Sequence, residues 1–503
     1  MGGSAYDFSV LAPVGFVAIG AMFVLMLEVV LSRKSASGEI QRTLSSTRME
    51  IVLAGVASFA LLLAIYTAMD LFAKGGRAFF FAANPMLNFD PLSTFAIVLL
   101  ALAALLSVWL SITFLPALHI NHGEYYALLL LSTVGMFVLV SSVNFMVLFV
   151  GLELMSIPIY ALVGFDRSRL RSNEAALKYF LTGAFASAVL LYGMALLYGA
   201  TGEISFDGVR EGFEAGGSLA VAGLALVIVG FGFKIAAVPF HQWAPDVYEG
   251  APATVTAFMA VAVKAAAFVI LLRFLAFALP DESAALKNLL WILALLTIVV
   301  GNVMAVIQTN VKRMLAYSSV AHAGYLLIGL TAGTPKASAA ILFYLAAYLF
   351  MNLGAFGVVV ALARGGKECE NIDDFAGLAA RKPGMAALMA LFMFSLAGMP
   401  GTAGFMAKFY LFSAAVEAGL VPLVIVAVLA CVVSVFYYLR LPVAMYMREP
   451  TEEEPGETSS SELTVLAVCA VAVLFLGFFP NSDIGNGALR LLDIAGKAAS
   501  ILH

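Results

Sequence analysis

Apolar stretches long enough to cross a bilayer recur from one end of this 503-residue chain to the other. A helix needs about 20 consecutive apolar residues to span the hydrocarbon core. Hydrophobic residues make up 63% of the chain and charged residues only 12%, a balance that water-soluble domains do not have. We therefore predict an all-α polytopic membrane protein with about fourteen transmembrane helices. The predicted spans are 8–31, 50–72, 91–116, 124–142, 144–165, 173–199, 218–241, 253–279, 286–308, 313–331, 337–362, 384–416, 421–447 and 462–480.

The Lys and Arg residues between these spans favour one orientation. If the N-terminus lies outside, the inner loops carry about twice as many Lys and Arg as the outer loops and tail, as the positive-inside rule requires. The first stretch, 8–31, is too long for a signal peptide and lacks a basic segment before it, so we expect it to be a membrane span. The polar, acidic segment 448–461 is predicted to be a flexible inner loop.

Two groups of five predicted spans resemble each other. The groups begin near 124 and 286, and Ala236–Pro239 in the first resembles Ala397–Pro400 in the second at nearly the same offset. A five-helix repeat in an up-and-down chain must reverse its orientation, and prolines at matching places predict a broken helix in each repeat. The expected regions are 1–123 with the first three helices, 124–279 and 286–447 as inverted repeats, and 448–503 with the acidic loop, a last helix and an amphipathic tail.

Several classes of site are excluded by composition and spacing. Cys369, Cys431 and Cys469 lie far apart and form no cluster with histidine, so we expect no metal or iron–sulfur site. The chain has neither a glycine-rich dinucleotide motif nor a P-loop, which argues against a nucleotide site. It also lacks a basic patch, so we expect no nucleic-acid partner. No cofactor is therefore expected in this chain, and redox or ATP energy would come from another subunit.

A lysine followed by a proline marks the predicted span 218–241. Lys234 stands in an apolar helix, where a charged side chain costs about 2.5–3.5 kcal/mol on insertion scales. Pro239 breaks the helix at membrane depth, which is tolerated only where protein or a water-filled cavity satisfies the freed backbone. The bland alternative is a snorkelling lysine beside an ordinary proline kink. Charge and break together favour an ion-handling site in a transporter.

Further charged residues lie within the predicted spans. Lys264 and Lys408 stand well inside apolar segments, and Glu153 is the one carboxylate predicted near the bilayer midplane. A lone buried carboxylate would take up a proton, whereas one beside a lysine can stay ionised. We therefore predict that Glu153 pairs with Lys234 and that Lys178, nearer the inner face, lies close to this pair. Lysine suits proton transfer because desolvation makes its proton easier to release.

Four other side chains admit two interpretations each. His322 could bridge the lysines of the two repeats, because histidine titrates near physiological pH, or it could be a satisfied packing residue. His241 could take up protons at the inner end of the broken span, or it could cap the helix. Arg273 and Arg440 lie toward helix ends, where snorkelling to the interface is the favoured interpretation.

Taken in chain order, the polar residues form a row of Glu153, Lys234, Lys264, His322 and Lys408. The row runs through both repeats. Such an arrangement predicts movement of charge along the membrane plane. It does not resemble a central pocket for a sugar or an amino acid.

The motifs that place the chain in a known family are Gly151–Leu154, Glu174–Phe180, Phe233–Lys234 with Val238–Trp243, Gln308–Ser319, and Gly398–Phe405 with Lys408. With these the chain resembles the antiporter-like membrane subunits of respiratory complex I. Within that family, 176–179 and 245–252 resemble subunit N of bacterial NADH-quinone oxidoreductase, whose mitochondrial counterpart is NADH dehydrogenase subunit 2. One departure is Ala251–Thr256, which replaces the usual Pro-Thr-Pro-Val pattern, and we expect a local packing change there.

The resemblance implies a proton-translocating subunit in a bacterial cytoplasmic membrane, driven by NADH oxidation and quinone reduction in other membrane-arm and redox subunits. It implies that Glu153 and Lys234 form the coupling pair, which Lys178 tunes. Lys264 would be the central relay and Lys408 the terminal residue toward the outer exit.

Two alternatives stay open at this point. A subunit of a multi-subunit sodium/proton antiporter shares the same core. A scaffold subunit that has lost transport is the other, although retaining intramembrane lysines at their energetic cost argues against it.

Overall fold

The computed structural model describes residues 8–34, 40–42, 46–81, 84–279, 284–363, 367–450, 458–481 and 490–503. Part of the predicted acidic loop, 451–457, lies outside the described residues. Within the described part, 13 helices are long and apolar enough to cross a membrane. They are α1 (Ala12–Leu31), α2 (Ser46–Ala73), α3 (Pro91–Ala117), α4 (Glu124–Ser141), α5 (Phe145–Val163), α6 (Leu170–Thr201), α8 (Gly217–Lys234), the continuous segment α10 (Ala253–Phe258), η2 (Met259–Val263) and α11 (Lys264–Phe277), α12 (Ala284–Val306), α13 (Val311–Ala332), α14 (Pro335–Ala361), α18 (Val421–Met447) and α19 (Ser460–Phe478).

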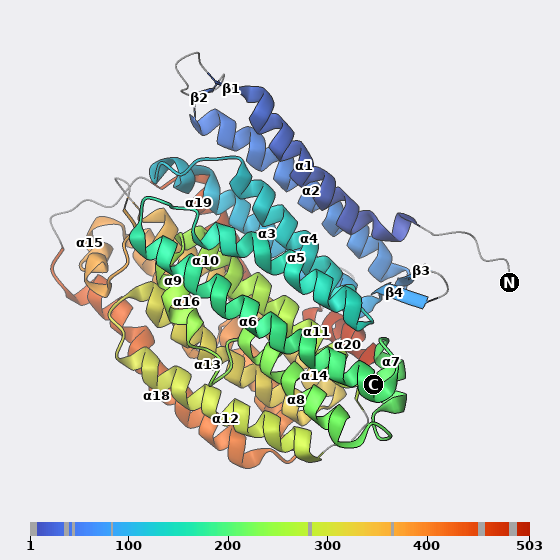
Figure 1. The fold of residues 1–503 in the computed structure, drawn as a ribbon. Coiled ribbons are helices and arrows are strands. Elements are labelled where there is room, and N and C mark those ends of the chain that lie inside the picture. Colours follow the sequence, from blue (N-terminus) through green and yellow to red (C-terminus); the bar gives the residue numbers. More distant parts are fainter. Residues whose placement is uncertain are drawn as a thin grey trace.

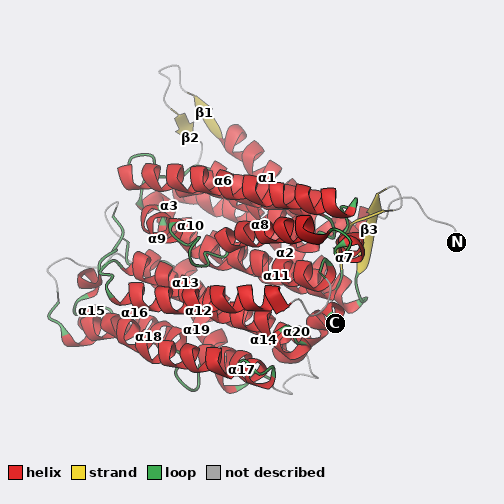
Figure 2. Ribbon diagram, turned by 60° about the horizontal axis from the view of Figure 1, so that its bottom comes forward, coloured by secondary structure: helices red, strands yellow, loops and turns green. Residues whose placement is uncertain are grey.

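Shorter elements connect or interrupt these helices. The short helices are η1 (Phe8–Leu11), α7 (Phe206–Gly212), α9 (Trp243–Gly250), η3 (Ile372–Phe375), α15 (Leu378–Arg381), α16 (Pro383–Ala397), α17 (Ala403–Glu417), α20 (Leu491–Ala499) and η4 (Ser500–Leu502). Two antiparallel strand pairs were not predicted: β1 (Ser32–Lys34) with β2 (Ile40–Arg42), and β3 (Arg77–Phe81) with β4 (Asn84–Phe89). Figure 2 shows that both pairs lie at the ends of an otherwise helical bundle.

Local sequence signals fix many of the helix ends. Asp90 caps α3 by accepting a hydrogen bond from the backbone N–H of Ser93, and Pro91 follows at the first helical position. Asn144 and Asn310 cap α5 and α13 in the same way. Gly398 ends α16 with a φ of 92°, a conformation that a residue with a side chain rarely adopts.

Both predicted breaks are present, with two corrections to their detail. The predicted span 384–416 consists of two short helices, α16 and α17, separated at 398–402. In the predicted span 218–241, α8 ends at Lys234 itself, five residues before Pro239, and the chain then turns through an irregular stretch into α9. The helix therefore stops earlier than the proline alone would require.

The bundle has an exposed periphery and a buried centre. Figure 1 shows α1 and α2 at one edge, with α12 and α18 at the opposite edge. The α10–η2–α11 segment, α13 and α14 are buried along nearly their whole length, whereas α1, α2, α6 and α18 leave much of their apolar surface open. The central helices carry Lys264 and His322, so these polar side chains are buried in the middle of the bundle.

Candidate functional site

Lys234 lies buried at the C-terminal end of α8, with 3% of its surface exposed. Its Nζ donates hydrogen bonds to two hydroxyl groups of α5, at 2.8 Å to Ser156 Oγ and 3.4 Å to Tyr160 OH. The ammonium also lies over the Tyr160 ring, 5.6 Å from its centroid. The site is thus built by the helix end that presents Lys234 to a polar stripe on α5.

Glu153 lies on the same helix, one turn before Ser156. Among the described residues, however, no carboxylate comes within 4.0 Å of the Lys234 ammonium. The Oε1 atom of Glu153 is buried and has no hydrogen-bond partner in that part of the chain. The two predicted partners are therefore not in direct contact, and Ser156 and Tyr160 hold the lysine.

The break after Lys234 is satisfied by neighbouring protein groups. The backbone N–H of Val238 donates to Thr297 Oγ1 of α12 at 3.0 Å, and Trp243 Nε1 donates to the carbonyl oxygen of Phe233 at 2.9 Å. Irregular backbone at membrane depth requires such partners. His241 stands partly exposed just beyond the break, near the Tyr317 ring, and its Nδ1 atom is buried.

Lys264 is the next buried lysine along the predicted row. It follows the π-helical turn η2, and 3% of its surface is exposed. Its Nζ donates to the backbone oxygen of Ser319 at 2.5 Å and also to the hydroxyl of Ser319, on the adjacent α13. Such π-bulges are frequent at functional sites. The Tyr248 hydroxyl lies 3.4 Å from the same Ser319 Oγ.

His322 is held between two tyrosines. Its Nδ1 is hydrogen-bonded to Tyr344 OH at 2.6 Å and its Nε2 to Tyr438 OH at 3.1 Å. Tyr438 is also hydrogen-bonded to Ser318, which precedes the Ser319 that holds Lys264. A continuous chain of Ser318, Tyr438, His322 and Tyr344 thus joins α13, α18 and α14.

Among the described residues His322 makes no hydrogen bond to Lys264 or Lys408, so its bridging role stays a prediction. The two tyrosines were missed in the sequence. Their only signal there is that each stands among the few polar groups of an apolar helix.

Lys408 closes the row at the second break. It lies on α17 with 6% of its surface exposed, and its Nζ donates to the carbonyl oxygens of Leu396 and Ala397, both at 2.9 Å. These carbonyls end α16 and have lost their helical partners, so the lysine satisfies them. The Tyr325 ring lies 5.3 Å from the ammonium. Lys408 therefore follows the break between α16 and α17, whereas Lys234 precedes the break between α8 and α9.

Lys178 does not lie beside Lys234. Its side chain is half-exposed on α6 and forms ion pairs with Glu174 at 2.7 Å and Asp246 at 3.0 Å. Asp246 also pairs with Arg313 at 2.6 Å. Burial alone would raise the pKa of Asp246, but the hydrogen bonds from Arg313 and Lys178 hold that pKa below its ordinary value. The predicted proximity to the buried pair was wrong because α6 turns Lys178 toward the surface.

Arg273 was also misassigned as a snorkelling residue. It is 1% exposed and forms a bidentate ion pair with Asp90, at 2.7 and 2.8 Å. Arg440 is partly exposed and donates to the carbonyl oxygens of Val306 and Gln308, at the end of α12. The first arginine therefore joins α11 to α3, and the second caps a helix.

A buried charge cluster near the start of α13 was not predicted. Lys312 is fully buried, pairs with Glu368 at 2.6 Å and donates to the carbonyl oxygen of Ala251 at 2.7 Å. Arg169 pairs with Glu370 at 2.6 Å beside it. Burial raises the pKa of Glu370, but Lys312 and Arg169 more than offset this and lower it below its ordinary value. The sequence shows these residues as ordinary loop charges, because their partners lie far away in the chain.

In the part of the chain that the structure describes, no group of three or more His, Cys, Asp or Glu side chains could hold a metal ion. The side chains along the row carry carboxyl, ammonium and imidazole groups, with hydroxyl groups beside them. Each of these can take up and pass on a proton.

Comparison with known proteins places this site in a family. Residues 142–434, more than half of the chain, match the family described as NADH:quinone oxidoreductase/Mrp antiporter, TM. The chain is 48% identical over 398 residues to NADH-quinone oxidoreductase subunit N of Trichlorobacter lovleyi, covering 78% of this chain and 82% of that protein.

Solved structures are similar over nearly the whole chain. A chain of respiratory complex I from Thermus thermophilus is 33% identical with a TM-score of 0.77, covering 94% of this chain and 98% of that one. A chain of the Mrp complex from Dietzia sp. DQ12-45-1b has a TM-score of 0.85 over 99% and 98% of the two chains, but at 22% identity it shows the fold alone. The resemblance predicted from the motifs is thus confirmed, and the chain belongs to the family of NADH-quinone oxidoreductase subunit N, an antiporter-like membrane subunit of complex I.

Proposed function

We propose that this subunit carries protons across the membrane through the row Glu153, Lys234, Lys264, His322 and Lys408. Electron transfer from NADH to quinone would take place in other subunits and supply the energy. The observation that carries the proposal is the state of the three buried lysines. Each is held by neutral hydroxyl or carbonyl groups, and none has a carboxylate within 4.0 Å among the described residues. No direct ion pair with a described residue therefore fixes them as ammonium groups.

We assign each residue of the row a role in this path. Glu153 and Lys234 form the coupling pair, and the Ser156 hydroxyl that accepts from Lys234 lies one helical turn after Glu153 on α5. Lys264 is the central relay, Lys408 the terminal residue toward the outer exit. Ordered water would complete the segments where no side-chain hydrogen bond is present.

His322 connects the two halves of the row. Its two ring nitrogens are hydrogen-bonded to Tyr344 and Tyr438, so a proton accepted on one side can be released on the other. Lys178 is outside this path, and we assign to it the ordering of the surface charges around Asp246.

The wider arrangement is also part of the proposal. We infer inverted repeats at 124–279 and 286–447, with 1–123 and 448–503 packed around them. The chain would lie in the bacterial cytoplasmic membrane with its N-terminus on the outer side, in contact with the other membrane-arm subunits of complex I.

The proposal is tested by NADH-driven proton pumping in membrane vesicles. Lys234→Ala should leave the complex assembled while pumping and coupled quinone reduction collapse. Lys336→Ala is the matched control, because Lys336 is an exposed lysine paired with Glu417 and should behave as wild type. Unchanged pumping in an assembled Lys234→Ala complex would refute the proton path and favour a scaffold role.

A sodium/proton antiporter subunit is the second candidate, supported by the shared fold. Pumping that requires sodium, or a sodium gradient that drives it in reverse, would favour that candidate. Pumping that is independent of sodium would favour the first.

A further inference from the structure

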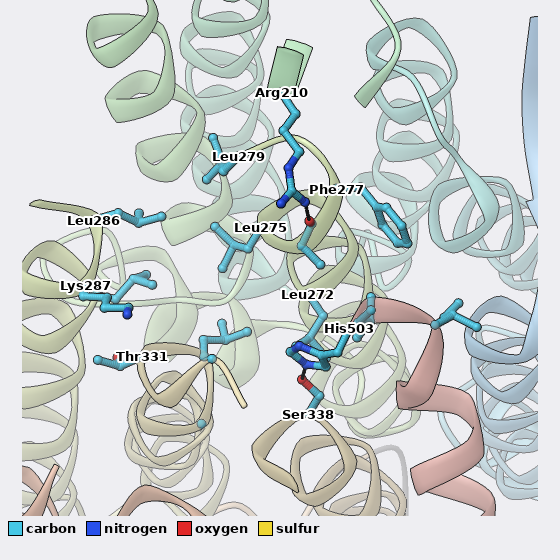
Figure 3. A pocket seen from close by; sticks show the side chains of 17 residues that line it. Arg210, Leu272, Leu275, Phe277, Leu279, Leu286, Lys287, Thr331, Ser338 and His503 are labelled. Atoms are coloured by element: carbon cyan, nitrogen blue, oxygen red, sulfur yellow. Dashed lines mark hydrogen bonds between the residues drawn. The ribbon is translucent and has the colours of Figure 1, made fainter. Parts of the chain in front are cut away.

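The Lys408 ammonium lies over the Tyr325 ring of α13, 5.3 Å from the ring centroid. The lysine is 6% exposed and the tyrosine 1%. Figure 3 shows a cavity near the end of α13 that Thr331 lines, and neither Tyr325 nor Lys408 is among its described lining residues. A cation over an aromatic face is attracted by the quadrupole of the ring, most strongly where water is excluded. The pair is therefore placed for an interaction that favours the charged lysine.

The hydrogen bonds of Lys408 leave room for this interaction. A charged lysine has three N–H donors and no acceptor. Two of these donors are used by the carbonyl oxygens of Leu396 and Ala397, both at 2.9 Å, which leaves one N–H for the ring. Glu417, the one acidic residue of α17, pairs with Lys336 at the far end of that helix. The ring is thus the electron-rich surface that meets the ammonium beside the two carbonyl groups.

The orientation of the Tyr325 ring is fixed by groups other than Lys408. Its hydroxyl oxygen accepts from Asn302 Nδ2 of α12 at 3.2 Å, and Asn302 Oδ1 accepts from the Tyr437 hydroxyl of α18, also at 3.2 Å. The ring also packs edge-on against His322, with centroids 5.7 Å apart, and against Phe412, with centroids 5.8 Å apart. Its face is therefore presented to the lysine by contacts with three different helices.

A related pair lies at the other break. The Lys234 ammonium is 5.6 Å from the centroid of the Tyr160 ring, and α5 and α13, which carry the two tyrosines, are the second helices of the two inferred repeats. In the first pair the Tyr160 hydroxyl itself accepts from Lys234 at 3.4 Å. In the second, the hydroxyl is turned to Asn302, so the ring face alone meets the lysine. The feature that both pairs share is the ring.

We propose that Tyr325 is a positioning residue for Lys408 and that its ring stabilises the charged lysine at the break between α16 and α17. The inference rests on the proposed function, in which Lys408 is the terminal residue of the row. A proton that arrives at Lys408 charges it, and the ring and the two carbonyl groups hold the ammonium until the proton leaves. Because the same ring packs against His322, it contacts both of the last two members of the row.

The test changes the electronic character of the ring and keeps its shape. Tyr325→Phe removes the hydroxyl, and one, two or three fluorine atoms are then added to the ring at this position in the assembled complex. Fluorine withdraws electron density from the ring face, so the rate of NADH-driven proton pumping in vesicles should fall with each fluorine. Tyr325→Leu, which removes the ring, should lower that rate roughly 2- to 30-fold, the range to which cation–π energies correspond.

Two controls separate the electronic effect from packing and from a neighbouring thiol. Phe343 is a buried ring of α14 that packs against Tyr410, and no cation lies over it among the described residues. The same fluorine series at Phe343 should leave pumping unchanged. The Cys431 thiol of α18 faces both Tyr325 and Lys408, so Cys431→Ala tests whether the thiol holds the ammonium, and this variant should keep most of its pumping.

Three outcomes would overturn the proposal: a flat fluorine series at Tyr325, an equal fall along the Phe343 series, or a Cys431→Ala variant that reproduces the whole loss. Lys408→Met separates this inference from the proposed function. Normal pumping by an assembled Lys408→Met complex would refute the proton path itself, whereas loss of pumping together with a flat fluorine series would refute only the role of the ring. The fluorinated rings keep their shape, so they serve if the Tyr325→Leu complex fails to assemble.

Discussion

The buried ion pair between Arg273 and Asp90 allows a quantitative test of how α11 is joined to α3. The guanidinium and the carboxylate are bonded through two contacts, at 2.7 and 2.8 Å, and Arg273 is 1% exposed. Asp90 also caps α3, because its Oδ1 accepts from the backbone N–H of Ser93 at 2.9 Å. Three variants are compared: Arg273→Met, Asp90→Asn and the double variant that carries both substitutions.

Each single substitution leaves one buried charge without its partner. Removing one member of such a pair costs about 3–5 kcal/mol, whereas replacing both is often close to neutral. Asn is as good an N-cap as Asp, so Asp90→Asn keeps the cap of α3 and removes only the charge. We therefore expect the double variant to be more stable than either single variant.

The free energy can be measured by limited proteolysis of the purified complex, under conditions where cleavage follows the population of the opened form. A loss of 3 kcal/mol corresponds to a rise of roughly 150-fold in that population. Each single variant should therefore be cleaved at least about 100-fold faster than wild type, and the double variant should recover most of its resistance.

Arg440→Met provides the control, because the hydrogen bonds of Arg440 to described residues go to the carbonyl oxygens of Val306 and Gln308, at and just after the end of α12. Combined with Asp90→Asn, its effect should be additive within about 0.3–0.5 kcal/mol. Single variants that resist proteolysis as well as the wild type would contradict the buried-pair interpretation. A double variant as labile as the sum of its singles would show that the pair does not act as a unit.

Three other predictions follow from single contacts. Ser319→Ala removes the hydroxyl that accepts from Lys264, so pumping should slow several-fold in vesicles while assembly is kept. The carboxyl of Glu370 has a pKa below its ordinary value, because adjacent cations outweigh the effect of burial, so its contribution is present at neutral pH and should be lost only as pH falls below about 4, as a pH series of thermal midpoints would show. Gly404→Ala would bring a methyl group 1.8 Å from a backbone oxygen, so it should destabilise the α16–α17 contact by about 1–3 kcal/mol or more, whereas Gly384→Ala has open space and should be neutral in the same assay.

Much of the fold was predictable because hydrophobic length and charge are local properties of the sequence. The spans, the two breaks and the burial of Lys234, Lys264 and Lys408 could all be inferred from the cost of leaving polar groups in hydrocarbon. The exact form of the breaks could not, because α8 stops at Lys234 through contacts made by Thr297 and other distant groups.

The partners of the charged residues were less accessible. Lys178 and Arg273 each occupy helices whose sequence allows either a buried or a surface position. The rotation of α6 turns the first outward to Asp246, and the packing of α11 on α3 turns the second inward to Asp90. Rotation about a helix axis depends on neighbouring helices, which an apolar helix with little amphipathicity does not specify.

The sequence by itself determined that this chain is a helical membrane protein with lysines buried in its apolar segments, since each apolar run and each buried charge carries its own energetic consequence. The tertiary structure alone decided which groups those lysines meet. Tyr344 and Tyr438 reach His322 from two different helices, and Ser319 reaches Lys264 from a third. Hydrogen bonds act over about 3 Å, so only the packing of helices distant in sequence can bring such groups together.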